Sequence, residues 1–149
     1  MAMHCATCPA RRGHTLVELV LTIAMLGIAA AVAIPSLRTI ADRMSVRAAT
    51  QDVVLGLWAA RNVAAMRGDY ASFVVDAQSG RLQVVTGGDT VFARELTLKR
   101  GVTVRATRDS ITYAPSGVGF GAANTTIILS RGRRADTVVT SRLGRVSYR

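Results

Sequence analysis

The sequence predicts an α+β fold in which one long N-terminal helix, membrane-spanning in its first half, packs on an antiparallel β-sheet domain. Three observations indicate this fold. An apolar run without charge extends from Leu19 to Leu37, helical apolar periodicity continues to Arg67, and short alternating segments fill residues 69–149. At 149 residues, the chain has room for one such domain and a targeting segment.

The apolar run is long enough to span a bilayer and follows a basic N-terminal segment. That segment favours a cytoplasmic N-terminus, an inner-membrane span and a periplasmic C-terminal domain. Three other interpretations are a signal peptide cleaved after Ala31-Val32-Ala33, a twin-arginine signal at Arg11-Arg12, and a plain single-pass anchor. None of them uses Glu18, and a charged residue at the centre of a membrane helix costs about 3 kcal/mol or more.

The stretch from Arg11 through Gly13 to Glu18, with Pro35, resembles the leader and first segment of type IV pilins and type II secretion pseudopilins. The resemblance implies that a prepilin peptidase cleaves after Gly13 and that His14, where the family usually has Phe, becomes the N-methylated terminus. Glu18 is then the fifth residue of the mature chain, and Pro35 is the twenty-second. Glu18 and Pro35 are the expected assembly residues.

Glu18 has a physical role in this scheme. In a filament, its carboxylate can meet the terminal amine of a neighbouring subunit and fix the register between the two. Such a pair at 4 Å gains about 4 kcal/mol at an effective dielectric near 20, before desolvation is subtracted. The alternative is that Glu18 reaches the headgroups at the membrane edge.

The resemblance divides the chain into four parts. We expect a leader at 1–13, a transmembrane and assembly segment at 14–37, an amphipathic continuation of the helix at 38–68, and a periplasmic β-rich domain at 69–149. Pro35 is expected to kink or loosen the helix, and Gly68 to cap its end. The helix from His14 to Arg67 would be about 80 Å long.

Two apolar stripes follow Pro35, and Trp58 is expected to lie in the core or against a sheet. The first stripe contains Leu37, Ile40, Ala41, Met44 and Ala48, and the second contains Val46, Ala49, Val53, Leu57, Ala60 and Ala64. Period-two patterns predict seven or eight antiparallel strands. They lie at 71–76, 81–86, 90–98, 101–107, 110–114, 125–130, 137–140 and 145–148, with a glycine-rich hairpin connection at 117–121.

The second half also resembles the GspH/FimT group of minor pseudopilins. The shared traits are Ala60-Arg61-Asn62, Ile111-Thr112-Tyr113 before Pro115, the strand Ile127-Ile128-Leu129, and Gly144-Arg145-Val146. The resemblance implies a structural subunit present in few copies near a filament tip, with other pilins or pseudopilins, the prepilin peptidase and the inner-membrane assembly platform as partners. Its function would be protein secretion, although the sequence leaves a secretion system and a pilus equally open.

Catalysis, cofactors and metals are not expected. The two histidines are His4 and His14, and both cysteines, Cys5 and Cys8, lie in the expected leader. Nucleophilic Ser–His and Cys–His systems are therefore excluded from the globular domain. The glycines of 117–121 lack the Lys-Ser/Thr of a phosphate loop.

The net charge of +10 raises a second function, DNA binding during DNA uptake. Some FimT-like minor pilins bind DNA through a C-terminal Gly-Arg-x-Arg element, which Gly144-Arg145-Val146 matches until Ser147 replaces the second arginine. The candidate DNA-binding residues are Arg131, Arg133, Arg134, Arg142, Arg145 and Arg149, with Tyr113 and Tyr148 as candidates for base stacking. Solvated strand ends are the alternative role for these arginines, and a third class, an unrelated secreted or anchored β-domain, stays open.

Overall fold

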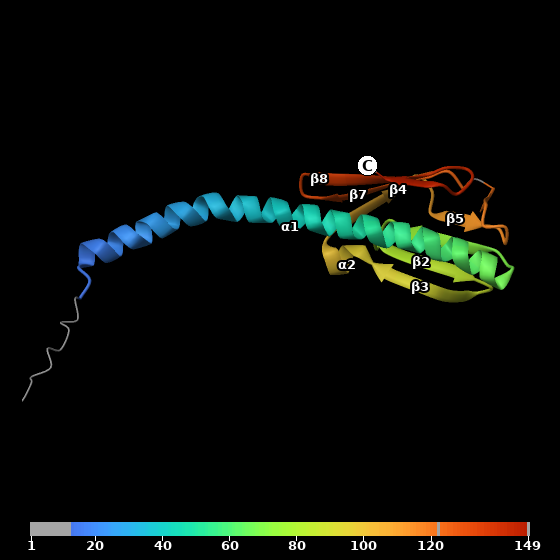
Figure 1. Ribbon diagram of the computed structural model, residues 1–149, viewed down its shortest axis with the longest axis horizontal. Coiled ribbons are helices and arrows are strands. Elements are labelled where there is room, and N and C mark those ends of the chain that lie inside the picture. The colour runs from blue at the N-terminus through green and yellow to red at the C-terminus, as the bar shows by residue number, and fades with distance from the viewer. Residues whose placement is uncertain (1–12, 122, 149) are drawn as a thin grey trace, which may run out of the picture. The chain divides into compact units, whose positions relative to one another are not determined.

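The computed structural model describes residues 13–121 and 123–148 of the chain. The chain divides into two compact units, residues 1–37 and residues 38–149. Figure 1 shows the long helix and the strands that follow it. The predicted α+β fold, a long N-terminal helix packed on antiparallel sheets, is confirmed.

Helix α1 extends from Leu16 to Arg67 and comprises 52 residues. It begins two residues later than predicted and remains helical through Pro35. It ends directly before Gly68, whose φ of 64° lies in the left-handed region that glycine adopts without strain. All described residues of the first unit, 13–37, are exposed.

In the second unit, the second predicted stripe of α1 forms the helical side of the core. Its six members, Val46, Ala49, Val53, Leu57, Ala60 and Ala64, are all buried. Gly56 belongs to the same face, and a Cβ there would lie 2.3 Å from Cε2 of Phe73. The absence of a side chain at this position therefore lets the first strand approach the helix closely.

The outward face of α1 is more apolar than expected. Trp58 is 62% exposed, so its prediction as a core residue is wrong. Its position is offset from the buried stripe, and Leu57 fills the neighbouring site in the core. Leu37, Ile40 and Met44 of the first stripe are exposed as well.

The remainder of the second unit forms two antiparallel sheets instead of one. The elements are β1 (Ala71–Asp76), β2 (Arg81–Thr86), β3 (Asp89–Glu95), α2 (Leu96–Arg100), β4 (Thr103–Ala106), β5 (Ser110–Tyr113), β6 (Gly119–Phe120), β7 (Thr125–Arg131), β8 (Arg134–Thr140) and β9 (Val146–Tyr148). The first sheet has the order β3-β2-β1-β5-β6, and the second has the order β4-β7-β8-β9. In Figure 1, β2 and β3 of the first sheet and β7 and β8 of the second lie on different sides of α1. The alternating residues of both sheets that point inward share one hydrophobic core with the helix.

Two predictions about the strands are corrected. The strand expected at 90–98 stops at Glu95, and Leu96–Arg100 form the short helix α2. In α2 the side chain of Leu96 is buried, and the backbone amide of Leu96 donates to the carbonyl oxygen of Gly80 at 2.9 Å. The glycine-rich segment expected to be only a connection contains β6, which pairs with β5.

Candidate functional site

The N-terminal candidate site is exposed and lies where α1 begins. Gly13, His14 and Thr15 precede the helix, and Glu18 lies in its first turn. The amide of Glu18 donates to Oγ1 of Thr15 at 3.2 Å, so Thr15 is the N-cap. Thr15 and Glu18 have the spacing of a capping box, a signal that the sequence contained and that our sequence analysis missed. Glu18 makes no ion pair among the described residues.

Polar side chains within the apolar segment are satisfied by the helix itself. Oγ1 of Thr22 donates to the carbonyl oxygens of Glu18 and Leu19, and Oγ of Ser36 donates to that of Ala33 at 2.8 Å. Internal satisfaction is what a bilayer requires of a spanning helix. Among the described residues, α1 is the one helix long and apolar enough to cross a membrane, with a mean hydropathy of 2.4 in its most apolar window.

The candidate DNA-binding arginines separate into two groups at opposite ends of β8. Arg131, Arg133 and Arg134 surround the β7–β8 turn, whereas Arg142 and Arg145 lie between β8 and β9. A strand of seven residues separates the groups by about 20 Å. Arg149 lies outside the described residues, as do Cys5, Cys8, Arg11 and Arg12.

Arg131 is held by the protein. Its Nε lies 2.9 Å from Oδ1 of Asp42, and its Nη1 donates to Oγ of Ser45 at 2.9 Å and to the carbonyl oxygen of Arg100. Asp42 and Ser45 belong to α1, so these contacts fasten the β7–β8 turn to the helix. Arg131 has few donors left for a phosphate group.

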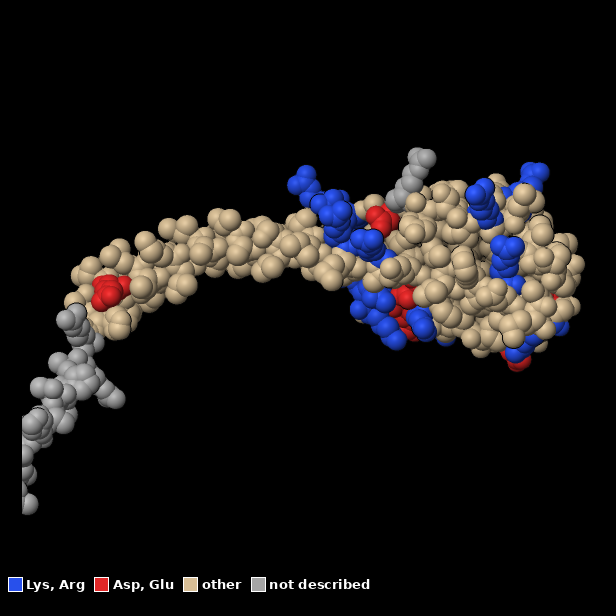
Figure 2. Space-filling model, viewed as in Figure 1, with Lys and Arg blue, Asp and Glu red and all other residues tan. Residues whose placement is uncertain are grey.

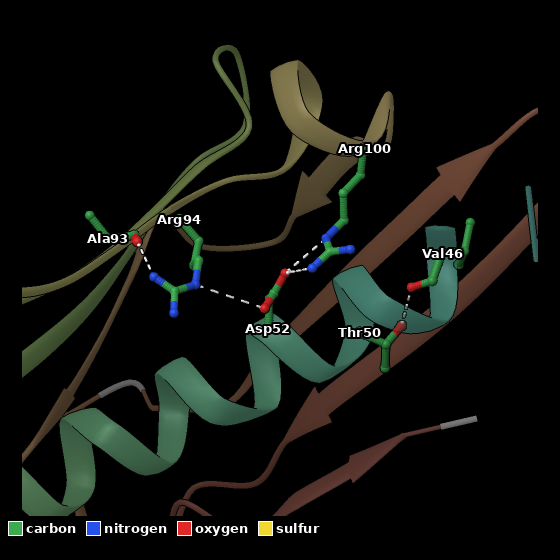
Figure 3. Close-up of polar contacts among 6 residues, drawn as sticks. All are labelled: Val46, Thr50, Asp52, Ala93, Arg94 and Arg100. Carbon is green, nitrogen blue, oxygen red and sulfur yellow. Dashed lines mark hydrogen bonds and ion pairs between the residues drawn. The ribbon is translucent and has the colours of Figure 1, made fainter. Parts of the chain in front are cut away.

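A second ion pair fastens α2 and β3 to the helix (Figure 3). Oδ2 of Asp52, on α1, lies 3.0 Å from Nε and 2.9 Å from Nη2 of Arg100. Nε of Arg94 lies 4.0 Å from Oδ1 of Asp52, and the guanidinium group of Arg94 lies over the ring of Phe92. The side chain of Asp52 is only 13% exposed, so the pair is shielded from solvent on the helix side.

A groove of about 270 Å³ lies between α1 and the segment before β9. It is lined by Leu57, Trp58, Arg61, Asn62, Tyr113, Gly144, Arg145 and Val146. Tyr113 is fully buried and therefore cannot stack on a base, in contrast to our expectation, whereas Tyr148 is 67% exposed. Burial raises the pKa of the Tyr113 hydroxyl, and the nearby Arg61 opposes this shift. Sequence analysis missed Trp58 as an exposed aromatic residue of this groove.

No group of three or more His, Cys, Asp or Glu side chains suited to a metal ion occurs in the part of the chain that the structure describes. The carboxylates near the arginines instead form ion pairs, as Asp42 and Asp52 do.

Comparison with known proteins identifies the family. The family model of the type II transport protein GspH matches residues 49–144, and that of the prokaryotic N-terminal methylation motif matches residues 8–34. The chain belongs to the GspH family. Its members are structural pilin subunits and not enzymes, and the GspH chain described here is a minor pilin or pseudopilin of a type IV pilus or type II secretion system. The apolar helix and the family support a single-pass protein of the inner membrane.

Two solved structures show the same fold. The type IV minor pilin FimU of Pseudomonas aeruginosa has a TM-score of 0.60 and 14% identity, over 72% of this chain and 90% of that one. The minor pseudopilin EpsH from the type 2 secretion system of Vibrio cholerae has a TM-score of 0.52 and 14% identity, over 72% of this chain and 94% of that one. A search of curated proteins gives no match.

The ion pair of Asp52 should stabilise the globular unit measurably. Hydrogen bonds to charged groups contribute about 2 kcal/mol, so Asp52→Ala should lower the Tm by about 8 °C in a thermal melt followed by circular dichroism. Asp89→Ala is the matched control, because it breaks an exposed pair with Arg67 that is worth less than about 1 kcal/mol. Equal melting temperatures for the two variants would contradict a stabilising role for Asp52.

Proposed function

We propose that this GspH-family chain is processed by prepilin peptidase after Gly13, N-methylated on His14, and built into a pseudopilus that supports protein secretion. In this proposal the leader stays cytoplasmic, the globular unit lies in the periplasm, and the assembly platform adds the subunit to other pilins or pseudopilins. One observation carries it: Gly13, His14 and Glu18 are all exposed at the start of an apolar helix with no buried residue before Val46.

The geometry of the first turn supports the pairing of Glu18 with a neighbour. Thr15 satisfies the amide of Glu18, while the carboxylate has no ion-pair partner among the described residues. Cleavage after Gly13 would create an amine on His14, four residues before Glu18. Each subunit would then carry one cation and one anion at its membrane end, which suits pairing between staggered copies or different pilins.

Processing can be tested by mass spectrometry and N-terminal sequencing of the protein purified from membranes. We expect the chain to start at a methylated His14. Gly13→Val should leave the longer precursor as the main species, because the peptidase of this family cuts after glycine. Gly27→Val is the control and should be processed normally. A chain starting at Ile34 would instead show signal-peptide cleavage and contradict the proposal.

The charge of Glu18 can be separated from its place in the capping box. Glutamine serves at the third position of a capping box, so Glu18→Gln keeps the helix start and removes only the charge. If the carboxylate pairs with a neighbouring amine, Glu18→Gln and Glu18→Leu should both lower incorporation into sheared filaments at least tenfold, at equal membrane levels. Thr15→Ala, which removes the N-cap, is the control with intact charge. Normal incorporation of Glu18→Gln would contradict pairing.

DNA binding in natural transformation is the second candidate function, and the groove beside Arg145 favours it. An exposed indole, Trp58, lies there with the arginines Arg61 and Arg145, a combination that suits stacking and phosphate contact. Arg142 and Arg145 are exposed and form no ion pair among the described residues. Binding of this kind would be independent of base sequence.

An electrophoretic shift titration of the full chain in detergent, repeated at several salt concentrations, tests this function. Arg145→Ala should weaken DNA binding several-fold and reduce the salt slope by about one, as loss of one phosphate contact predicts. Arg133→Ala tests the arginines at the β7–β8 turn, at the other end of β8. It should weaken binding as well only if DNA contacts the arginines at both ends of β8. Arg67→Ala removes an arginine from the exposed pair with Asp89 and is the control. The absence of a shift would contradict DNA binding, and equal affinities of Arg145→Ala and Arg67→Ala would contradict binding at the groove beside Arg145.

A further inference from the structure

We propose that five arginines at the start of the globular unit bind anionic phospholipid headgroups on the membrane surface from which the chain emerges. Arg38, Arg43 and Arg47 lie on α1, and Arg133 and Arg134 lie at the β7–β8 turn. These five residues are called the headgroup surface. Figure 2 shows basic side chains gathered at the end of the globular unit where its part of α1 begins.

The β7–β8 turn is fixed against α1, which brings the two segments together. Arg131 forms an ion pair with Asp42. The next residue, Gly132, lies so close to the helix that a Cβ there would be 2.6 Å from Oδ2 of Asp42. As a result, Arg38, Thr39, Asp42, Gly132, Arg133 and Arg134 line one hollow on the surface. A neighbouring groove is lined by Arg43 and Arg47 together with Asp136 and Tyr148.

The headgroup surface carries positive charge that the described residues do not neutralise. All five arginines are exposed, and none forms an ion pair within the described part of the chain. Two carboxylates line these hollows. Asp42 pairs with Arg131, whereas Asp136 accepts a hydrogen bond from the uncharged Thr50 and keeps its charge, so one negative charge faces five positive ones. A cluster of this kind attracts a phosphate-bearing partner, and guanidinium groups can bind phosphate with two parallel hydrogen bonds.

The position of the arginines in the chain favours a membrane as that partner. Arg38 directly follows the apolar run that ends at Leu37, and Arg43 follows that run by six residues, or about 9 Å of helix. The headgroup layer extends about 5–7 Å beyond the hydrocarbon core, and the Debye length adds about 8 Å. With the edge of the hydrocarbon core at Leu37, Arg38 and Arg43 lie within this distance of the lipid phosphates.

Exposed apolar side chains between these arginines also suit the membrane interface better than DNA. Ile40 is 55% exposed and Met44 is 68% exposed, and both lie on α1 within one turn of Arg43. Apolar residues interleaved with arginines are typical of segments that lie at the boundary of headgroups and acyl chains. Ile40 and Met44 offer no charge or hydrogen bond to a phosphate backbone, whereas acyl chains at the membrane interface can cover them.

The test uses the full chain reconstituted in nanodiscs of phosphatidylcholine, with or without a third of phosphatidylglycerol. A fluorescent donor on Ala135→Cys, in a Cys5→Ser/Cys8→Ser background, reports energy transfer to acceptor-labelled lipid headgroups. We expect transfer to rise at least twofold with phosphatidylglycerol and to fall again at 0.5 M salt. Each arginine near an anionic surface should change the docked-to-undocked ratio about fivefold.

Two independent double variants locate the effect. Arg133→Gln/Arg134→Gln and Arg38→Gln/Arg43→Gln should each abolish the rise with phosphatidylglycerol, while Arg142→Gln/Arg145→Gln, at the other end of β8, should retain it. Thermal melts should be unchanged, because all these side chains are exposed. Equal transfer in both lipid mixtures would overturn the proposal. The proposal would also be overturned if the two double variants of the headgroup surface lost binding to a DNA duplex in solution but kept the full response to phosphatidylglycerol.

Discussion

The globular unit depends on one contact, the packing of two sheets on the narrow apolar face of α1. Alanines and Gly56 on this face keep the helix surface shallow, so strands can approach it, while Val53 and Leu57 fill the space between them. Both sheets contribute residues to this one core. The ion pairs of Asp42 with Arg131 and of Asp52 with Arg100 then fasten the β7–β8 turn and α2 to the same helix.

Local sequence patterns predicted the elements whose stability is local or periodic. The stripe from Val46 to Ala64, the helix end before Gly68 and most strands follow from spacing alone, so the sequence identified them. Helix α2 could not be found in this way, because it depends on burial of Leu96 and on the carbonyl oxygen of the distant Gly80. The exposure of Trp58 was missed because large apolar residues are buried on average. Only the position of Trp58 around the helix axis, outside the buried stripe, shows that it faces solvent.

The candidate site divides in the same way. The stretch from Gly13 to Glu18 is contiguous, so the sequence alone could propose it as a site. The spacing of Thr15 and Glu18 could likewise have predicted the N-cap. The arginines are different, because their roles depend on partners far along the chain. Arg131 forms an ion pair with Asp42, 89 positions earlier in the chain. Arg100 forms one with Asp52, 48 positions earlier. No local pattern reports such pairs.

Under the proposed orientation, the arginines of the leader also help to set the orientation of the chain in the membrane, because the arginines on α1 oppose it. Positive residues close to a membrane span favour the cytoplasmic side, and Arg38, Arg43 and Arg47 all follow the apolar run closely. Taken alone, these three would favour the reverse orientation. Arg11 and Arg12 in the leader oppose them during insertion, when the orientation is set. Once the proposed cleavage removes Arg11 and Arg12, the three arginines beyond Leu37 are unopposed, and they remain beside the lipid surface that we propose they bind.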